Sequence, residues 1–318
     1  MKEFTIRPDE AGQRFDKYLK KLLKDANSGF IYKMLRKKNI VLNGKKSDGT
    51  DILSVGDTVK LFLSDDTFSK FSSAEDTKEK LDSLPNWDEN RPPFDIIYED
   101  DDIVVINKPA GLLSQKADVY DVSCNEYILA YLLHSKKISE ESMKTFRPSV
   151  LNRLDRNTSG ILLAGKTLSG SQKMSEALKD RSVHKFYYTL VSGKVSEAMT
   201  VEAYLLHDEK TNKVNIYDRQ VDGSKKIITR YKPVDFKNDV TLLEIELITG
   251  RTHQIRAHLA SLGHPIIGDT KYGNKNVNKQ FRDAYGVKHQ LLHAHKLVLE
   301  DGTSIECEPP AIFKRVIN

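Results

Sequence analysis

The sequence predicts an α+β protein in two unequal parts: a small α/β domain over residues 1–64, and a larger domain over residues 94–318 with a mainly antiparallel, mixed sheet. The first part contains two amphipathic helical patterns followed by a strand-like run. Residues 65–93 are polar and acidic and end on two prolines, which is typical of a mobile linker. In the larger part, strand-like segments alternate with occasional helices.

The first expected helix covers residues 14–24. Its apolar side chains recur at helical spacing and form one stripe: Phe15, Tyr18, Leu19, Leu22 and Leu23. The lysines of the segment lie on the opposite side. A helix with one buried and one solvated face follows from this pattern.

A second helix is expected to begin at Ser28 as its N-cap and to bury Ile31 and Leu35. Residues 40–46 then read as a strand that enters an Asn-Gly hairpin turn. The exposed face of the second helix and its end are basic, through Lys33, Arg36, Lys37 and Lys38.

Charge is distributed unevenly along the chain. Residues 1–64 contain fourteen Lys or Arg against eight Asp or Glu, whereas residues 65–91 contain four against eight. A run of lysines is most often a solvated helix face. Here both helices and the turn concentrate the same sign in one small domain, which favours contact with phosphates.

Beyond the linker, the expected elements follow in order. Trp87, Phe68 and Phe71 are expected to pack the linker onto a domain. Strand patterns occupy residues 95–106, 161–164, 185–193, 240–247 and 291–294, and helical patterns occupy 168–181 and 253–262. Residues 274–288 are polar enough to predict a long loop or lid.

Residues 151–160 read LNRLDRNTSG and precede the apolar run 161–164. This pattern predicts a loop that feeds a buried strand, with Asp155 at its mouth between Arg153 and Arg156. A carboxylate held between arginines can be kept ionised and aimed, as a nucleophile or general base must be. An isolated motif of this kind is more often a structural ion pair.

A second run, TGRTHQIRAHL, covers residues 249–259 at the junction of a strand and a helix. The first turn of a helix offers free backbone N–H groups to anions. Arg251, at this junction, therefore suits either a phosphate or a partner carboxylate.

Together the two runs resemble the RluA-type pseudouridine synthase family, whose signature is Arg-Leu-Asp-x-x-Thr-Ser-Gly. Three further segments match that family in collinear order: the strand-turn-strand and Lys-Pro-x-Gly loop at 95–111, the Lys-x-Tyr strand at 185–193, and the Leu-His-Ala strand at 291–294. The order of elements in residues 1–64 is similar to the S4 RNA-binding module. The resemblance implies a pseudouridine synthase fold for the larger domain.

The resemblance also implies a reaction. Uridine in RNA is isomerised to pseudouridine: the N1–C1′ bond breaks, the uracil turns, and C5 bonds to C1′. No cofactor is required, and the target nucleotide must leave its stack to be reached. Family analogy with an S4 module favours ribosomal RNA of the large subunit (23S) as the substrate.

Residue roles follow from the same resemblance. Asp155 would be the essential carboxylate, attacking the sugar or the base or removing a sugar proton. Arg251 would orient it through a bidentate pair, and Tyr187 would stack on the uracil. The remaining expected RNA and pocket contacts are Arg153, Lys185, Lys108, Ile248 and Leu292 together with the basic residues of the second helix.

The sequence leaves other functions open. The chain could modify transfer RNA, or could be a catalytically silent RNA-binding or ribosome-assembly protein. A glycosidic hydrolase would need a second carboxylate in a comparable motif, which the sequence lacks. The histidines match no zinc spacing, so no metal is expected.

The composition of the chain predicts its cellular location and the state of its cysteines. The 318 residues include only two cysteines, far apart, which predicts reduced thiols and no disulfide framework. No apolar run has membrane-spanning length and the charged N-terminus lacks a signal core, so a cytoplasmic enzyme without a membrane contact is expected. A monomer that requires no protein partner is the default expectation.

Overall fold

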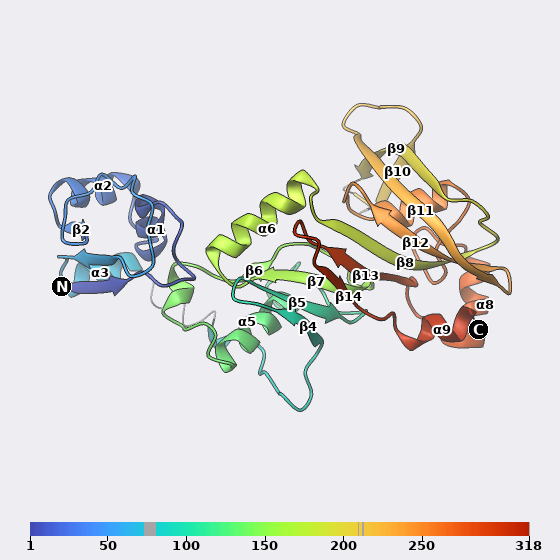
Figure 1. The fold of residues 1–318 in the computed structure, drawn as a ribbon, viewed down its shortest axis with the longest axis horizontal. Helices are drawn as coiled ribbons and strands as arrows, with labels where there is room; N and C mark the ends of the chain where they lie inside the picture. Colours follow the sequence, from blue (N-terminus) through green and yellow to red (C-terminus); the bar gives the residue numbers. More distant parts are fainter. Residues whose placement is uncertain (73–80, 209, 212, 318) are drawn as a thin grey trace.

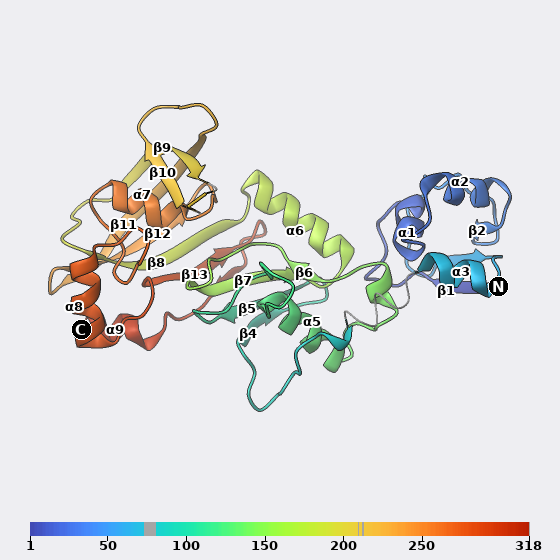
Figure 2. The same ribbon diagram turned by 180° about the vertical axis from the view of Figure 1, so that it is seen from behind.

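The computed structural model describes residues 1–72, 81–208, 210–211 and 213–317. Figures 1 and 2 show an elongated molecule in which the N-terminal residues, in blue, form a lobe at one end. The opposite end is formed by the sheet and helices of the C-terminal half. A separate apolar core lies inside the N-terminal lobe.

The N-terminal lobe is a three-stranded antiparallel sheet, in the order β1-β3-β2, covered by two helices. Its elements are β1 (Lys2–Thr5), α1 (Phe15–Leu22), α2 (Ser28–Arg36), β2 (Ile40–Leu42) and β3 (Thr58–Leu61). The predicted apolar stripe of α1 is buried.

Two local signals set the boundaries within the lobe. Asn27, one residue earlier than expected, caps α2, since its side-chain oxygen accepts a hydrogen bond from the Phe30 backbone N–H at 2.8 Å. Asn43 and Gly44 both have positive φ, 49° and 70°, as the predicted Asn-Gly turn requires.

The segment predicted to be a linker begins with a helix. Its first residues form a helix, α3 (Asp65–Ser72), because Phe68 and Phe71 pack on aromatic rings of the lobe at centroid distances of 5.9 and 4.6 Å. Residues 73–80 of the predicted linker lie outside the described residues. Further on, Trp87 packs 5.1 Å from the ring of Tyr131. All three aromatic residues therefore anchor this segment, as predicted.

One large sheet organises the rest of the chain. Its strands run in the order β10-β9-β11-β12-β8-β13-β7-β5-β4, with β14 paired to β13 and β6 to β7. They are β4 (Asp95–Glu99), β5 (Ile103–Lys108), β6 (Ser149–Val150), β7 (Ser159–Gly165), β8 (His184–Ser192), β9 (Met199–Asp208), β10 (Lys213–Tyr217), β11 (Lys225–Lys237), β12 (Val240–Leu247), β13 (Leu292–Val298) and β14 (Ser304–Glu306). Among the described strand pairs only β13–β7 is parallel, so the predicted α+β class with a mainly antiparallel, mixed sheet is confirmed.

The parallel pair is close at one point. Gly160 of β7 lies opposite Ala294 of β13 with φ +107°, and a Cβ there would come within 2.2 Å of the Ala294 carbonyl oxygen. Only glycine fits both the backbone conformation and the space. This contact fixes where β7 begins, directly after the Asp155 loop.

Helices flank the sheet. They are α5 (Cys124–His134), the 3₁₀ turn η1 (Ser142–Lys144), α6 (Leu168–Asp180), α7 (Gln254–Ser261), α8 (Lys275–Tyr285) and α9 (Ala311–Ile317). α6 packs on β7, and α7 on β10 and β11. None of the described helices is long and apolar enough to cross a membrane. Cys124 and Cys307 are both free and buried.

The predicted loop at 274–288 is instead the helix α8. The Asn274 side chain accepts hydrogen bonds from two backbone N–H groups of the first turn, and Gly286 ends the helix with φ 74°. The sequence analysis predicted a loop because most residues of this segment are polar. Only one face of the helix, including Phe281, contacts the core.

The N-terminal lobe touches the larger part through polar contacts. The buried Glu10 carboxylate accepts a hydrogen bond from the Thr145 hydroxyl. Nearby, the backbone N–H of Leu168 donates to the Asp9 carbonyl at 3.1 Å, and Arg7 donates to Ser139. These contacts join the lobe to η1 and to the start of α6.

Candidate active site

A pocket of about 700 Å³ opens where β7 begins and β12 ends, and a smaller hollow of about 60 Å³ adjoins it. Asp155 and Tyr187 line both spaces. Among the described residues that line the larger pocket, Asp155 is the single acid and six are basic: Arg153, Arg156, Lys185, Arg251, Arg256 and Lys271. The pocket therefore attracts anions around one carboxylate.

Asp155 projects into the pocket from the loop between β6 and β7, with 27% of its side chain exposed. Its Oδ2 accepts a hydrogen bond from Nη1 of Arg256 at 2.7 Å. Its backbone carbonyl accepts from the Thr158 N–H at 3.0 Å, which closes the loop before β7. The carboxylate is thus oriented by a charge-assisted bond while part of it stays accessible.

Arg256 is itself held by a second carboxylate. Its Nε and Nη2 donate to the two oxygens of Asp269 at 2.7 and 2.9 Å, and the Asp269 side chain has no exposed surface. Burial alone would raise the pKa of Asp269, but hydrogen bonds and charge from Arg256, with the backbone N–H groups of residues 271 and 272, lower it overall. Arg256 accordingly bridges a buried acid and a pocket acid.

The start of α7 sets the position of Arg256. Gln254 accepts from the Arg251 N–H at 3.1 Å and from the Thr249 hydroxyl at 2.9 Å, while its amide donates to the Ile228 carbonyl at 3.1 Å. Before it, His253 adopts φ 53° and turns the chain into the helix. The first turn of α7 therefore points at the Asp155 loop.

His253 is a further pocket residue. Its Nε2 lies 3.9 Å from Oδ2 of Asp155, and its Nδ1 is 3.0 Å from the hydroxyl of Tyr272. Burial lowers the pKa of His253, and the guanidinium of Arg256 adds to this although Asp155 opposes it. The imidazole is hence favoured in its neutral form.

The expected Asp155–Arg251 pair is not formed; Arg256 takes that place. Arg251 lines the pocket but lies before the helix, exposed, with its backbone tied to Gln254. Arg256 lies within the first helical turn, and its side chain reaches back to the carboxylate. The residue type was predicted correctly and the position was wrong by five residues.

Lys108 does not reach the protein surface, contrary to its expected role as an RNA contact. Its side chain is fully buried, and Nζ donates to the carbonyls of Pro109, Leu112 and Arg156 at 3.0, 2.6 and 2.9 Å. Burial lowers its pKa to about 8. Lys108 thus ties the Lys-Pro-x-Gly loop to the Asp155 loop from inside.

Tyr187 lies on β8, 5% exposed, and its ring lines the pocket beside Asp155. Burial, and then the charge of Asp155, raises the pKa of its phenol. A phenol in this setting stays protonated at neutral pH. Its ring is available for packing against a planar group.

Of the other residues predicted to contact RNA or the base, some line the pocket and others do not. Arg153 is exposed at the pocket edge, and Lys185 lines the wall, where burial and then Arg181 lower its pKa. Leu292 lines the inner hollow. Ile248, which follows the end of β12, is not among the lining residues; Leu247, the last residue of that strand, lines both spaces.

The four basic residues of the lobe that were predicted to contact RNA are not among the residues that line this pocket. Lys33, Arg36, Lys37 and Lys38 are all exposed on α2 and the turn that follows it. Within the described part of the chain, no cluster of three or more His, Cys, Asp or Glu is placed to hold a metal ion.

Three residues of the site were not predicted: Arg256, Asp269 and His253. Asp269 was expected only to form a turn, which it does, since its Oδ1 also accepts the backbone N–H of Lys271 at 2.8 Å. The available signal was a second arginine five residues after Arg251, at the start of a helix. Its two carboxylate partners lie on either side of it in the sequence, Asp155 101 residues earlier and Asp269 13 residues later.

Comparison with known proteins assigns this arrangement to a class. Residues 102–261 match the family described as RNA pseudouridylate synthase, and this range contains both motifs. The chain belongs to that family and is an RNA pseudouridine synthase, an isomerase.

Among similar proteins is the ribosomal large subunit pseudouridine synthase C of Rickettsia felis, 33% identical over 91% of this chain and 88% of the relative. The protein of the same name from Vibrio vulnificus is 32% identical over 91% of this chain and 85% of the relative. A solved structure, human RNA pseudouridylate synthase domain containing 4, superposes with a TM-score of 0.56 at 24% identity, over 69% of this chain and 90% of that chain. It supports the same fold for the larger part.

Proposed function

We propose that this enzyme isomerises uridines in ribosomal RNA of the large subunit, with Asp155 as its essential carboxylate. Two relatives that match most of the chain carry that activity in their names. The observation that supports the role of Asp155 most directly is its place as the single acid of the pocket, oriented by Arg256.

The pocket suits a nucleotide taken out of its stack. Its volume of about 700 Å³ falls within the range of small-molecule sites. Exposed arginines at the rim, Arg153 and Arg251, can contact the phosphates on either side. Tyr187 and Leu247 supply flat apolar surface for the uracil. The base would then lie beside Asp155.

The chemistry requires that the glycosidic bond breaks and that C5 loses a proton after it bonds C1′. Asp155 can act either by attack on the sugar or base or by removal of a sugar proton. Because the phenol of Tyr187 stays protonated, we assign its ring to stacking and not to removal of the C5 proton.

We further propose that residues 1–64 act as an S4-like RNA anchor for the domain spanning residues 94–318. The support is the cluster of exposed basic residues on α2 and the turn after it. Phosphate contacts of this kind position RNA without reading its sequence. Specificity would then come from the pocket and its rim.

The proposal is tested by incubating unmodified large-subunit ribosomal RNA with the wild type and with Asp155→Asn. Pseudouridines are mapped by carbodiimide-dependent reverse-transcription stops. We expect discrete stops with the wild type and none with the variant, because the amide cannot act as a nucleophile or base. Circular dichroism and RNA binding of the variant provide the folding control.

Other outcomes separate the alternatives. Stops on transfer RNA alone would replace the ribosomal substrate with a transfer RNA. Full activity of Asp155→Asn would remove this residue from the chemistry. Release of free uracil would indicate hydrolysis of the glycosidic bond in place of isomerisation.

A further inference from the structure

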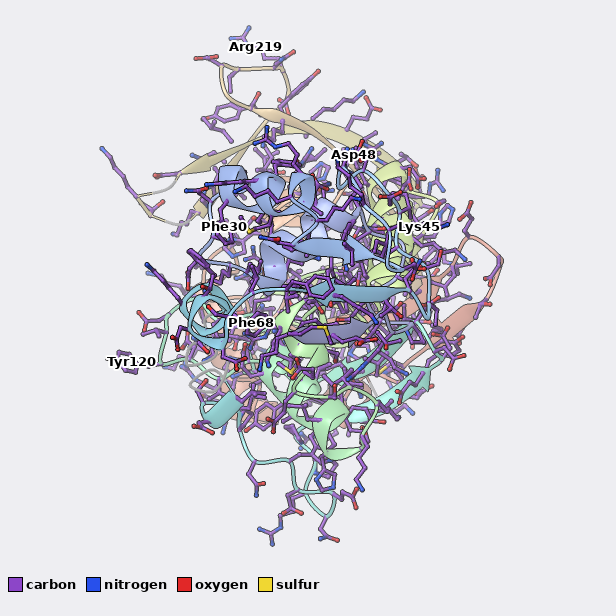
Figure 3. The ribbon with its side chains drawn as sticks, turned by 90° about the vertical axis from the view of Figure 1, so that its left-hand side faces the viewer. Phe30, Lys45, Asp48, Phe68, Tyr120 and Arg219 are labelled. Carbon is purple, nitrogen blue, oxygen red and sulfur yellow. The ribbon has the colours of Figure 1, made fainter. Side chains whose placement is uncertain are left out.

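Residues 112–123 form a loop beside the pocket that ends in an unusual tip. Tyr120 is 92% exposed, Val119 74% and Val122 44%, so three apolar side chains meet water at one place. Figure 3 shows Tyr120 at the outer margin of the molecule. Large exposed apolar groups gathered in this way mark a binding surface more often than isolated ones do.

The base of this loop is fixed to the Asp155 loop. The Ser114 hydroxyl accepts from the Leu154 N–H at 3.0 Å and donates to the Leu154 carbonyl at 2.9 Å, both buried. On the other side, the Gly111 N–H donates to the Arg156 carbonyl at 2.9 Å. The residues before and after Asp155 thus hold the loop in place.

The tip has an internal scaffold as well. The Asp121 carboxylate accepts from the backbone N–H groups of Ala117 and Asp118 at 3.0 and 2.8 Å, and Asp118 accepts from the N–H of Tyr120 at 3.2 Å. Both acidic side chains are therefore used to shape the turn. The ring of Tyr120 itself faces solvent, with 92% of the residue exposed.

The surroundings point to a nucleic acid partner. Asp121 also lies 3.9 Å from Arg156, which lines the pocket directly after Asp155. Lys116 is half-buried on the same loop, where its Nζ donates to the Val119 carbonyl at 3.3 Å. Tyr120 is therefore the chain neighbour of a residue that contacts a pocket-lining arginine. An aromatic ring beside cations is the arrangement that binds single-stranded bases.

We propose that Tyr120 stacks on an unpaired base of the RNA outside the pocket, next to the extruded uridine. The inference rests on the RNA substrate of the proposed function and extends the contact from one nucleotide to its neighbours. Stacking needs the ring and not the hydroxyl. Tyr120 is thereby a positioning residue that increases affinity and holds the target strand at the rim.

The test compares Tyr120→Ala and Tyr120→Phe with the wild type on one RNA fragment that the wild type modifies. We expect Tyr120→Ala to weaken RNA binding roughly tenfold or more, and Tyr120→Phe to stay within about twofold. The single-turnover rate at saturating enzyme is expected to change by less than about threefold. Phe236→Ala, which removes another exposed aromatic residue far along the chain on β11, is the matched control.

Equal RNA affinity of Tyr120→Ala and wild type would overturn the inference, as would an equal loss for Tyr120→Phe. A second readout does not depend on loss of affinity. Tyr120→Trp combined with Trp87→Phe leaves one tryptophan at the tip, whose fluorescence should be quenched as RNA binds. Unchanged fluorescence at saturating RNA would contradict stacking. Failure of the proposed function is distinct, since the wild type itself would then form no pseudouridine.

Discussion

Arg256 divides its hydrogen bonds between two carboxylates of different kinds. Asp269 is buried and takes two donors, whereas Asp155 is partly exposed and takes one. The two hydrogen bonds to Asp269 fix the guanidinium of Arg256 independently of its bond to Asp155. This fixed position allows one hydrogen bond to aim the pocket carboxylate.

Removing this arginine should therefore affect folding as well as catalysis. We expect Arg256→Gln to lower the free energy of unfolding by about 3–5 kcal/mol, because Asp269 would remain buried without its charged partner. Activity per folded molecule should also fall, since Asp155 loses its orienting bond. Urea unfolding and pseudouridine formation measure the two effects.

Arg251→Gln provides the matched comparison. It removes the same group from the same pocket, but Arg251 is exposed and bonds neither carboxylate. Its unfolding free energy should stay within about 0.5 kcal/mol of the wild type. If Arg251→Gln destabilises the protein as much as Arg256→Gln does, the described clamp is not what stabilises this site.

His293 shows how burial couples a residue to pH. Its Nδ1 lies 2.8 Å from the Ser159 hydroxyl and its Nε2 3.1 Å from the Cys307 carbonyl, which fits a neutral ring. Burial lowers its pKa to about 4, from about 6.5 in an unfolded chain. Between these values the unfolded chain binds a proton that the folded protein does not, so stability falls as pH drops.

The expected consequence is a difference between two pH profiles. From pH 7 to pH 5 the wild type should lose about 2 kcal/mol more unfolding free energy than His293→Gln, because only the wild type has this histidine to protonate when unfolded. Urea titrations at several pH values measure it. Parallel profiles for the two proteins would show that His293 titrates normally in the folded state.

At the scale of elements, the junction of β7 and β13 is the tightest contact near the site. We expect Gly160→Ala to lower the unfolding free energy by at least about 3 kcal/mol, because the new methyl meets the Ala294 carbonyl and the backbone has φ +107°. Thermal and urea unfolding provide the measurement.

Gly193→Ala separates the two causes. Gly193 has φ +87°, but a Cβ there would meet nothing within 4 Å. This variant should lose only about 1–2 kcal/mol, the cost of the backbone conformation. Similar losses for both glycines would show that the close approach to β13 contributes little.

The elements also show what local sequence could predict. Alternation located β12 at its exact limits, 240–247, and helical spacing located α1, since both signals lie within one element. The helix α8 was missed although Asn274 and Gly286 are ordinary cap residues, because its polarity outweighed them. Local sequence patterns suffice to locate a helix or strand where its buried residues recur at the spacing of that element.

The site was less accessible to this reasoning. Asp155 and Tyr187 were identified from motifs, but the choice between Arg251 and Arg256 depends on the direction in which α7 leaves Gln254. The burial of Lys108 likewise depends on three carbonyls, one of them from a loop 48 residues away. Such contacts are tertiary, so no local sequence pattern predicts them.

At the scale of the whole molecule, the pocket and the basic surface of the lobe lie on separate parts. We predict that replacing the lobe residues Lys33, Arg36, Lys37 and Lys38 with glutamine weakens RNA binding. A plot of the logarithm of the RNA association constant against the logarithm of salt concentration has a negative slope. The magnitude of this slope should decrease by up to about 3, because phosphate contacts are lost. The single-turnover rate at saturating enzyme should stay unchanged.

An equal change of charge elsewhere is the control for this prediction. Four lysines already paired with carboxylates serve: Lys144, Lys226, Lys232 and Lys296. Their replacement with glutamine should alter the salt slope much less. If both sets change it equally, net charge and not the lobe governs RNA binding.

The place of β13 in the sheet has a consequence for synthesis of the protein. Residues 292–298 lie between β8 and β7 and join two halves of the sheet that are complete earlier in the chain. Until this segment leaves the ribosome, β7 lacks its parallel neighbour and the loop that bears Asp155 lacks its support. The loop that bears Asp155 therefore gains its final support late in synthesis, after the strands on both sides of β13 have been made.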